Sequence, residues 1–299
     1  MAERRVEGNV AGVDSWSGLF KHVATARQSG GLKKASFKEN AMADELVKVE
    51  RSGDYLTVRL NRPEKGNAIN NAMLAALDAA FAGAQTDKAV RALLLTGEGK
   101  HFCAGIDLAE GHRVDTTEVG GGISLETVFH RLEALPMPTV AVMRGAALAG
   151  GLELGLHCDL RVAAENARLG MPVARVGLIP PFDFTRKLIE VIGASATAYL
   201  LFSGEPIDGK RALAMGMVNE VAPEGEVEAA GRVLLERISG NAPLSLRTIK
   251  ATLRRCMGDA FGAEHKDLDE MVKVILKSSD AKEGARAFVE KRKPVWKGE

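Results

Sequence analysis

Residues 141–154 constrain the fold of this chain more than any other stretch. They combine an apolar run typical of a buried strand, a turn of small residues that contains Gly150 and Gly151, and the beginning of a helix. Glycine has no Cβ atom, so a ligand can approach the main chain closely, and the first N–H groups of the following helix have no intrahelical acceptors. The pattern predicts a site for an anion or an oxyanion at the start of this helix.

Glu153 follows the two glycines and falls in the first turn of the predicted helix. Two interpretations stay open from this stretch alone. The carboxylate acts on whatever the backbone donors hold, or it caps the helix and complements the helix dipole, which is a common arrangement.

The charge balance excludes several kinds of partner. The 299 residues include 40 Lys and Arg against 39 Asp and Glu, a formal net charge of +1. No global field therefore attracts nucleic acid or an anionic membrane. No apolar run has the length needed to cross a bilayer, and no hydrophobic block of a secretory signal follows Met1. We expect a cytoplasmic protein that binds neither nucleic acid nor membrane.

Cysteine and histidine spacing indicates no metal site. Cys103, Cys158 and Cys256 are widely spaced and form no CxxC pair, and the six histidines form no HxxxH or HExxH pattern. We expect the cysteines to be buried or incidental thiols.

Residues 1–43 differ from the rest of the chain, since they are charged, contain Gly30 and Gly31, and show no sustained strand pattern. Three interpretations remain open for this leader. It is disordered, it forms a short helix that packs on a neighbouring subunit, or it precedes a natural start at Met42.

Residues 44–240 show alternating strand and helix patterns, and residues 241–299 show helical patterns only, which predicts an α/β body followed by a C-terminal helical region. Gly53 and Asp54 indicate a hairpin over residues 46–60. The other predicted strands cover residues 90–96, 141–144, 159–164 and 218–223, and the predicted helices cover residues 72–84, 124–135, 186–192, 194–202 and 209–215. A small-residue loop is expected at residues 97–108.

Several motifs together resemble the crotonase superfamily, the enoyl-CoA hydratase/isomerase group. The matching pieces occur in family order between residues 45 and 299: residues 60–68, 102–108, 145–153 with Cys158 and Asp159, 177–180, 212–221 and 288–294. The resemblance implies a spiral of ββα units, with C-terminal helices that pack a homotrimer or a hexamer. It also implies an acyl-CoA thioester as the substrate, with coenzyme A as part of that substrate and no permanently bound cofactor.

The resemblance also assigns roles by position. The main-chain N–H groups of Ile106 and Gly150 would form an oxyanion hole for the thioester carbonyl, with Glu153 as the general acid or base. The coenzyme A path would run along Lys65, Ala68, Ala104, Ile106, Asp107 and Leu108. Lys291 would meet a phosphate, although the cations at residues 291–293 also fit a solvated helix end.

Two positions depart from the family pattern. A hydratase of this family has a second glutamate, and the matching position here is Val173, which can neither hold water through a polar atom nor donate a proton. Asp183 lies in a segment where the family usually has small residues, between Phe182 and Phe184. It would supply a second acid to the pocket, or it would be the N-cap of the next helix.

We expect an enzyme of the enoyl-CoA hydratase/isomerase type, a lyase that stabilises a thioester enolate with Glu153 as its single acid/base. A CoA-thioester decarboxylase or hydrolase is the alternative that keeps the oxyanion hole and explains Val173. A non-catalytic acyl-CoA binding protein on the same fold remains the third hypothesis.

Overall fold

The computed structural model describes residues 46–107, 124–257, 273, 277–292 and 294–295. All the described residues belong to one compact unit within Asn40–Glu299. The predicted leader, residues 1–43, lies outside the described residues.

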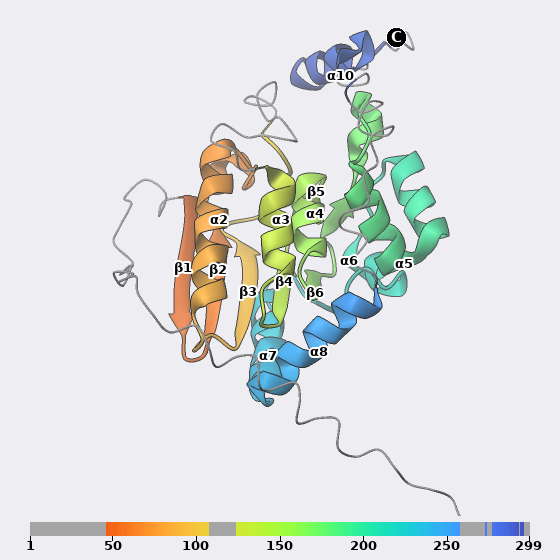
Figure 1. Cartoon of the computed structure of the whole chain (residues 1–299). Coiled ribbons are helices and arrows are strands. Elements are labelled where there is room, and N and C mark those ends of the chain that lie inside the picture. Colours follow the sequence, from red (N-terminus) through yellow and green to blue (C-terminus); the bar gives the residue numbers. More distant parts are fainter. Residues whose placement is uncertain (1–45, 108–123, 258–272, 274–276, 293, 296–299) are drawn as a thin grey trace, which may run out of the picture. The chain divides into compact units, whose positions relative to one another are not determined.

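A mixed sheet forms the centre of this unit (Figure 1). Its strands run in the order β1-β2-β3-β4-β6-β8, and β1 and β2 form an antiparallel hairpin while the remaining neighbours are parallel. The strands are β1 (Val47–Ser52), β2 (Tyr55–Leu60), β3 (Ala92–Gly97), β4 (Thr139–Met143), β6 (Leu160–Ala164) and β8 (Glu220–Ala222). A second, parallel pair joins β5 (Ala146–Leu148) to β7 (Arg168–Gly170).

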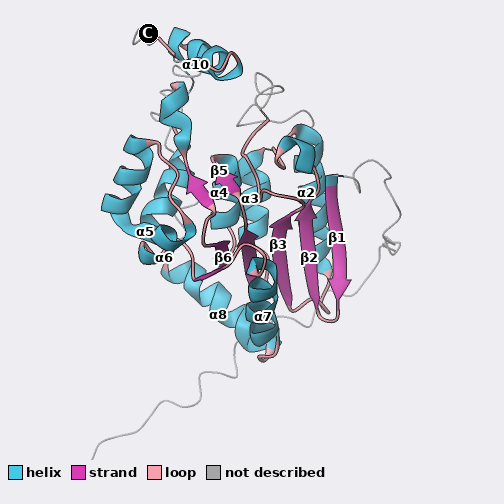
Figure 2. Ribbon diagram, turned by 180° about the vertical axis from the view of Figure 1, so that it is seen from behind, coloured by secondary structure: helices cyan, strands magenta, loops and turns pink. Residues whose placement is uncertain are grey.

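Helices cover both faces of the sheet. α2 (Asn71–Thr86), α3 (Leu125–Glu133) and α4 (Gly150–Leu156) lie on the face seen in Figure 1, and α7 (Val227–Ser239) lies on the face seen in Figure 2. Gly231 lets α7 pack tightly on β4, because a Cβ atom there would be 2.2 Å from Val142 Cγ2. The remaining helices are α5 (Phe182–Ser203), α6 (Gly209–Ala214), α8 (Pro243–Cys256) and α10 (Ser279–Val289), with the short 3-10 helices η1 (Pro63–Lys65) and η2 (Pro172–Val176).

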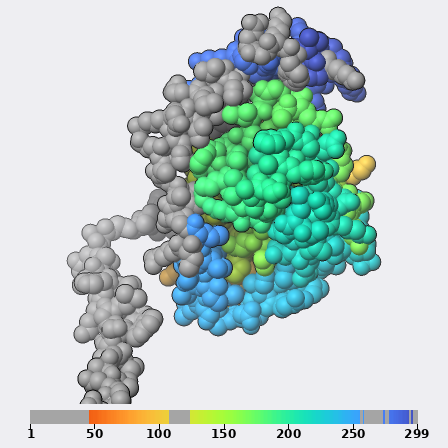
Figure 3. Space-filling view, turned by 90° about the vertical axis from the view of Figure 1, so that its right-hand side faces the viewer, coloured from red at the N-terminus to blue at the C-terminus, as the bar shows by residue number. Residues whose placement is uncertain are grey.

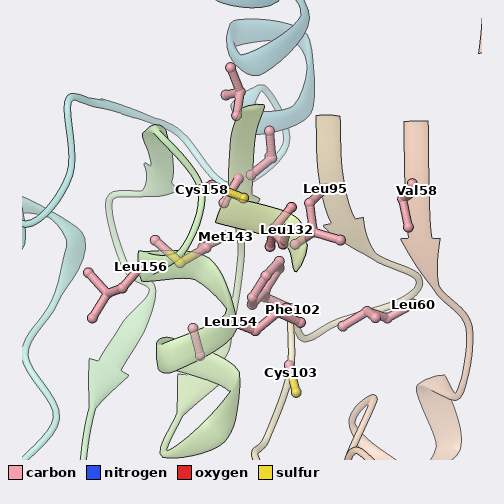
Figure 4. Close-up of a cluster of buried hydrophobic side chains, with 14 of the residues drawn as sticks. Val58, Leu60, Leu95, Phe102, Cys103, Leu132, Met143, Leu154, Leu156 and Cys158 are labelled. Carbon is pink, nitrogen blue, oxygen red and sulfur yellow. The ribbon is translucent and has the colours of Figure 1, made fainter. Parts of the chain in front are cut away.

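The hydrophobic core lies on both faces of the sheet, where α2, α3 and α4 cover one face and α7 covers the other. β3 is buried at every position, as expected for a parallel strand covered on both faces. Phe102, Leu132 and Met143 lie near Leu154 of α4 in Figure 4, and all four are essentially inaccessible to solvent. This packing holds α4 firmly on the core, and the site was predicted at the first turn of this helix.

The C-terminal helices belong to the same compact unit as the α/β body. α8 is tied to the sheet by the buried Lys250 Nζ, which donates to the Met137 carbonyl at 3.1 Å and to Asp159 Oδ2 at 2.7 Å. α10 packs on η2, where a Cβ atom on Gly284 would overlap the Val176 carbonyl.

Most predicted elements are confirmed, with shifts at their ends. The hairpin turns at Gly53, and Ser124 is the N-cap of α3, where its side chain accepts from the Thr127 N–H. The two helices predicted before and after Gly193 are both present; they share the label α5, and Gly193 lies between them in a non-helical conformation (φ 75°, ψ 163°). The first of the two begins at Phe182, earlier than predicted.

Candidate active site

The turn between β5 and α4 is held in a strained conformation. Ala149, the N-cap of α4, has φ 48° and ψ −124°. A residue with a Cβ atom adopts such angles at a cost of about 1–3 kcal/mol, and this kind of strain clusters at functional sites. The Ala149 N–H donates to the Gly170 carbonyl at 2.9 Å, so β7 secures the cap and α4 begins at Gly150.

The small-residue loop that precedes Leu108 docks on this turn. The Cys103 N–H donates to the Ala146 carbonyl, and the Leu148 N–H donates to the Cys103 carbonyl, both at 3.0 Å. Gly151 packs directly against the same Cys103 carbonyl. The loop and the start of α4 are therefore joined by their backbones.

Docking brings the backbones of Ile106 and Gly150 side by side. A Cβ atom built on Gly150 would be 3.9 Å from the Ile106 nitrogen, and one built on Gly105 would be 3.7 Å from the Gly150 nitrogen. Ile69 forms a parallel bridge with Ile106 through the two neighbours of Ile106. The Ile69 N–H donates to the Gly105 carbonyl at 2.7 Å, and the Ile69 carbonyl accepts from the Asp107 N–H at 2.9 Å. In such a parallel bridge the N–H of Ile106 itself points away from Ile69.

The predicted coenzyme A residues fall on two neighbouring loops. The Ala104 N–H donates to the Gly66 carbonyl at 2.9 Å, which joins Ala104 to the loop that carries Lys65 and Ala68. Lys65 ends η1 and is exposed, whereas Ala68 is buried. Leu108 lies outside the described residues.

Arg62 ties these two loops together. Its Nη1 atom donates to Asp107 Oδ2 at 2.5 Å and to the Ala68 carbonyl at 3.2 Å. Both side chains of the ion pair are largely shielded from solvent. Asp107 is thus held by its side chain as well as by its backbone, directly after Ile106.

Glu153 lies in the first turn of α4 and is 8% exposed. Burial is the main reason that its pKa rises to about 8, and the negative charges of Glu126 and Asp183 raise it further. Such a carboxyl exchanges a proton close to neutral pH, which suits a general acid or base.

Asp183 is not a helix N-cap, so that alternative is wrong. The N-cap of α5 is Pro181, and Asp183 lies inside the first turn, where its Oδ1 atom is 3.8 Å from Arg186 Nε. The fixed φ angle of proline favours the start of a helix directly after Pro181. The helix therefore begins before Asp183, which lies inside its first turn. The charge of Asp183 contributes to the raised pKa of Glu153, so the two carboxyls lie within electrostatic range of each other.

Glu126, in the first turn of α3, is a site residue that the sequence did not predict. It also acts electrostatically on Glu153. Its position beside the Ser124 N-cap is that of an ordinary glutamate complementing a helix dipole, so the sequence gives no signal that separates the two roles.

Comparison with known proteins identifies the family. The family model described as enoyl-CoA hydratase/isomerase matches residues 50–299. The chain belongs to the enoyl-CoA hydratase/isomerase family.

Named relatives of this hydratase/isomerase include both hydratases and a decarboxylase. A short-chain-enoyl-CoA hydratase of Clostridium acetobutylicum is 34% identical over 249 residues, which cover 83% of this chain and 95% of that protein. The crystal structure of a carnitinyl-CoA hydratase from Mycobacterium avium superposes with a TM-score of 0.76 at 36% identity, covering 85% of this chain and 99% of that one. A methylmalonyl-CoA decarboxylase solved with 2-nitronate-propionyl-CoA gives the same TM-score at 26% identity, with the same coverage.

The fold of this family member matches those solved structures, and the chain is an enzyme of the hydratase/isomerase type. Val173, predicted to replace a second glutamate, lies in η2, where it is half-buried and packs against the hydrophobic core. Phe184 is fully buried in that core, so of the two aromatics beside Asp183 only Phe182 keeps an exposed side chain.

Lys291 lies at the end of α10, outside the two loops that carry the other predicted coenzyme A residues of this hydratase/isomerase. It follows the last turn of α10 with φ 53°, and its side chain is exposed. The next residue, Arg292, forms ion pairs with Glu283 and Glu290, as cations at a helix end do.

Thiol chemistry is disfavoured in the described part of this family member. Cys103 and Cys158 are buried, and burial raises the pKa of each thiol to about 12, which leaves them unreactive. The side chain of Cys256 lies outside the described residues. Among the described residues, no His, Cys, Asp and Glu side chains group as metal ligands, and no helix is both long and apolar enough to cross a membrane.

Proposed function

We propose that this protein acts on an acyl-CoA thioester and that the N–H groups of Ile106 and Gly150 hold the thioester carbonyl oxygen. The observation that carries the proposal is the adjacency of these two backbones beside the buried carboxyl of Glu153. As negative charge develops on the oxygen, each donor stabilises it, and losing one such donor typically costs about 3–4 kcal/mol.

Glu153 moves the proton in the proposed hydration of a 2-enoyl thioester. Its carboxylate takes a proton from water while the water oxygen bonds to Cβ, and the electrons of the double bond move to the thioester oxygen. The enolate then collapses, and Glu153 returns the proton to Cα. A carboxyl with a pKa of about 8 serves both as base and as acid near neutral pH. With Val173 at the position of the second glutamate, one group performs both transfers.

Decarboxylation of a malonyl-type thioester is the second candidate. A buried carboxyl with a pKa of about 8 is mostly protonated at neutral pH, so it can donate to the enolate that loss of carbon dioxide leaves behind. The similarity to the methylmalonyl-CoA decarboxylase structure supports the same possibility.

A single variant tests the proposal. Glu153→Gln keeps the size of the side chain and removes its proton exchange, so we expect hydration to be lost while binding of the CoA thioester, measured by calorimetry, persists. Glu226→Gln is the matched control, because Glu226 is an exposed glutamate at the start of α7. Full turnover by Glu153→Gln would refute the role of Glu153.

A substrate panel separates the candidate reactions. We expect a 2-enoyl thioester to be hydrated faster than a malonyl-type thioester is decarboxylated. The reverse order would favour the decarboxylase. Tight binding without turnover of any thioester would make the protein a non-catalytic binder.

The coenzyme A part of the substrate is proposed to lie along the loops of Lys65, Ala68 and residues 104–108. Lys65 offers an exposed cation to a phosphate, and the surface of Ala104 leaves room beside the main chain. Lys291, which follows the end of α10, is proposed as a second contact to a phosphate.

We also propose a homotrimer or a hexamer. Exposed apolar side chains lie on α5, on α8 and at the end of α10, including Tyr199, Phe202, Leu244, Leu253 and Phe288, and the surface of α5 and α8 faces the viewer in Figure 3. Exposed apolar patches of this kind mark association surfaces. Sedimentation velocity should show a trimer or its double, and a monomer at micromolar concentration would contradict the proposal.

A further inference from the structure

Three buried polar side chains meet at the C-terminal end of α4, about one helical turn after Glu153. Lys187 Nζ donates to Glu133 Oε1 at 2.7 Å, and His157 Nδ1 lies 2.9 Å from Glu133 Oε2. All three residues are nearly inaccessible to solvent. They come from three helices, since Glu133 ends α3, His157 is the C-cap of α4, and Lys187 lies in α5. We call these three residues the buried triad.

The charge states of the buried triad follow from its surroundings. Burial alone would raise the pKa of Glu133, but the hydrogen bond from His157 and the charge of Lys187 together lower it to about 2. Burial lowers the pKa of His157, so the imidazole is neutral and donates its Nδ1–H to the Glu133 carboxylate. The His157 ring also lies 6.0 Å from the ring of His130. The triad is therefore one ion pair with a neutral hydrogen-bond donor.

Each member of the buried triad shares a helix face with an acid of the candidate active site. His157 follows Glu153 by about one helical turn, Lys187 follows Asp183 by about one turn, and Glu133 follows Glu126 by about two turns. Residues at these spacings lie above one another on a helix. The three acids that interact electrostatically are thus carried by the three helices that the triad joins.

We propose that Glu133, His157 and Lys187 are positioning residues, which lock α3, α4 and α5 so that Glu126, Glu153 and Asp183 face one another. The inference rests on the proposed function of Glu153. Glu126 and Asp183 raise the pKa of Glu153 only while they stay close to it, so the separation of the three helices that bear these acids has to be fixed. A buried carboxylate with two directional partners fixes that separation, because breaking its contacts leaves an uncompensated charge.

Glu133→Gln tests the proposal with little change in side-chain size. The amide oxygen still accepts from His157, but Lys187 loses its counter-ion. We expect α5 and α3 to relax away from α4, which carries Glu126 and Asp183 away from Glu153 and admits water. The apparent pKa of Glu153 in the pH profile of kcat/KM should then fall by about one unit. KM for the thioester should change little, because the triad touches no part of the proposed substrate path.

The control breaks the ion pair of a second buried lysine, Lys250, whose partner Asp159 is partly exposed. Asp159→Asn removes the partner of Lys250 at the same 2.7 Å separation, between α8 and the sheet. We expect both variants to unfold at a lower temperature, but only Glu133→Gln to shift the pH profile. An equal loss of thermal stability with a wild-type pH profile in both variants would overturn the proposal and make the buried triad merely structural.

Two further measurements keep the test decisive. His157→Phe keeps a ring, removes the neutral donor and leaves no new buried charge, so it provides the same readout, with a shift in the same direction, if Glu133→Gln does not fold. Direct 13C NMR titration of the Glu153 carboxyl requires no turnover. An unchanged titration in the folded variant overturns the positioning role, whereas retained turnover in Glu153→Gln overturns the proposed function instead.

Discussion

Gly151 lies so close to Cys103 that a Cβ atom built on it would be 2.2 Å from the Cys103 carbonyl oxygen. No side chain can occupy that space unless the backbone moves. The contact brings the first turn of α4 against the loop that ends at Ile106. It explains why two consecutive glycines occur where α4 begins: Gly151 permits the docking, and Gly150 leaves room beside the two N–H groups.

Gly151→Ala should therefore separate the loop from the helix. We expect a loss of about 1–3 kcal/mol in the free energy of unfolding, as for other overpacked sites, together with a large fall in kcat. Urea unfolding and steady-state kinetics measure the two effects. Gly225→Ala is the control, since a Cβ atom there meets nothing within 4 Å. Equal behaviour of the two variants would contradict this account of the turn.

Glu153 should reduce stability as the pH rises. In the unfolded chain its carboxyl ionises near pH 4.5, but in the folded protein it keeps its proton up to a pKa of about 8. Between these values the folded state binds more protons, so stability falls with rising pH, by at most about 5 kcal/mol from this group. Glu153→Gln should melt close to the wild type at pH 4.5 and well above it at pH 8. A constant difference in melting temperature across that range would show that Glu153 titrates normally.

The pH dependence of turnover should report the same carboxyl. If Glu153 acts as the base, kcat/KM for hydration rises with pH and levels off above about pH 8. Asp183→Asn removes one of the charges that raise this pKa, so we expect the rise to move to lower pH by about half a unit or more. A profile identical to that of the wild type would mean that Asp183 lies too far from Glu153 to matter.

Lys65→Ala tests the proposed coenzyme A path. Loss of an exposed cation beside a phosphate should raise KM about fivefold and leave kcat nearly unchanged, corresponding to about 1 kcal/mol. The effect should shrink at high salt, because salt screens exposed charges. Lys88→Ala, which removes another exposed lysine, should leave KM unchanged. If both variants have the same KM, coenzyme A does not pass Lys65.

The sequence predicted the parts of the site that depend on backbone chemistry. Gly150 and Gly151 indicate a close approach, Gly53 marks the hairpin, and the predicted helices 186–192 and 194–202 are interrupted at Gly193 in the structure. The second sheet was not predicted, because the three-residue strands β5 and β7 are too short for a recognisable alternation.

Side-chain relationships between helices were harder to foresee. Glu126 and the buried Glu133 lie on one helix in a pattern that fits an ordinary amphipathic α3. Which residues of α4 and α5 they meet depends on how the helices pack, and helix packing cannot be predicted from a local sequence pattern. The N-cap interpretation of Asp183 failed for a related reason, since Pro181 starts α5 earlier than the acid alone suggests.

The carbonyl stretch of a bound thioester tests the central claim most directly. Glu153→Gln should bind an acyl-CoA labelled with 13C at the thioester carbonyl without consuming it, and isotope-edited infrared difference spectra isolate that one bond. If the N–H groups of Ile106 and Gly150 both donate to its oxygen, the stretch moves to lower frequency on binding than in water. A frequency equal to or above that in water would show that the two amides do not hold the carbonyl.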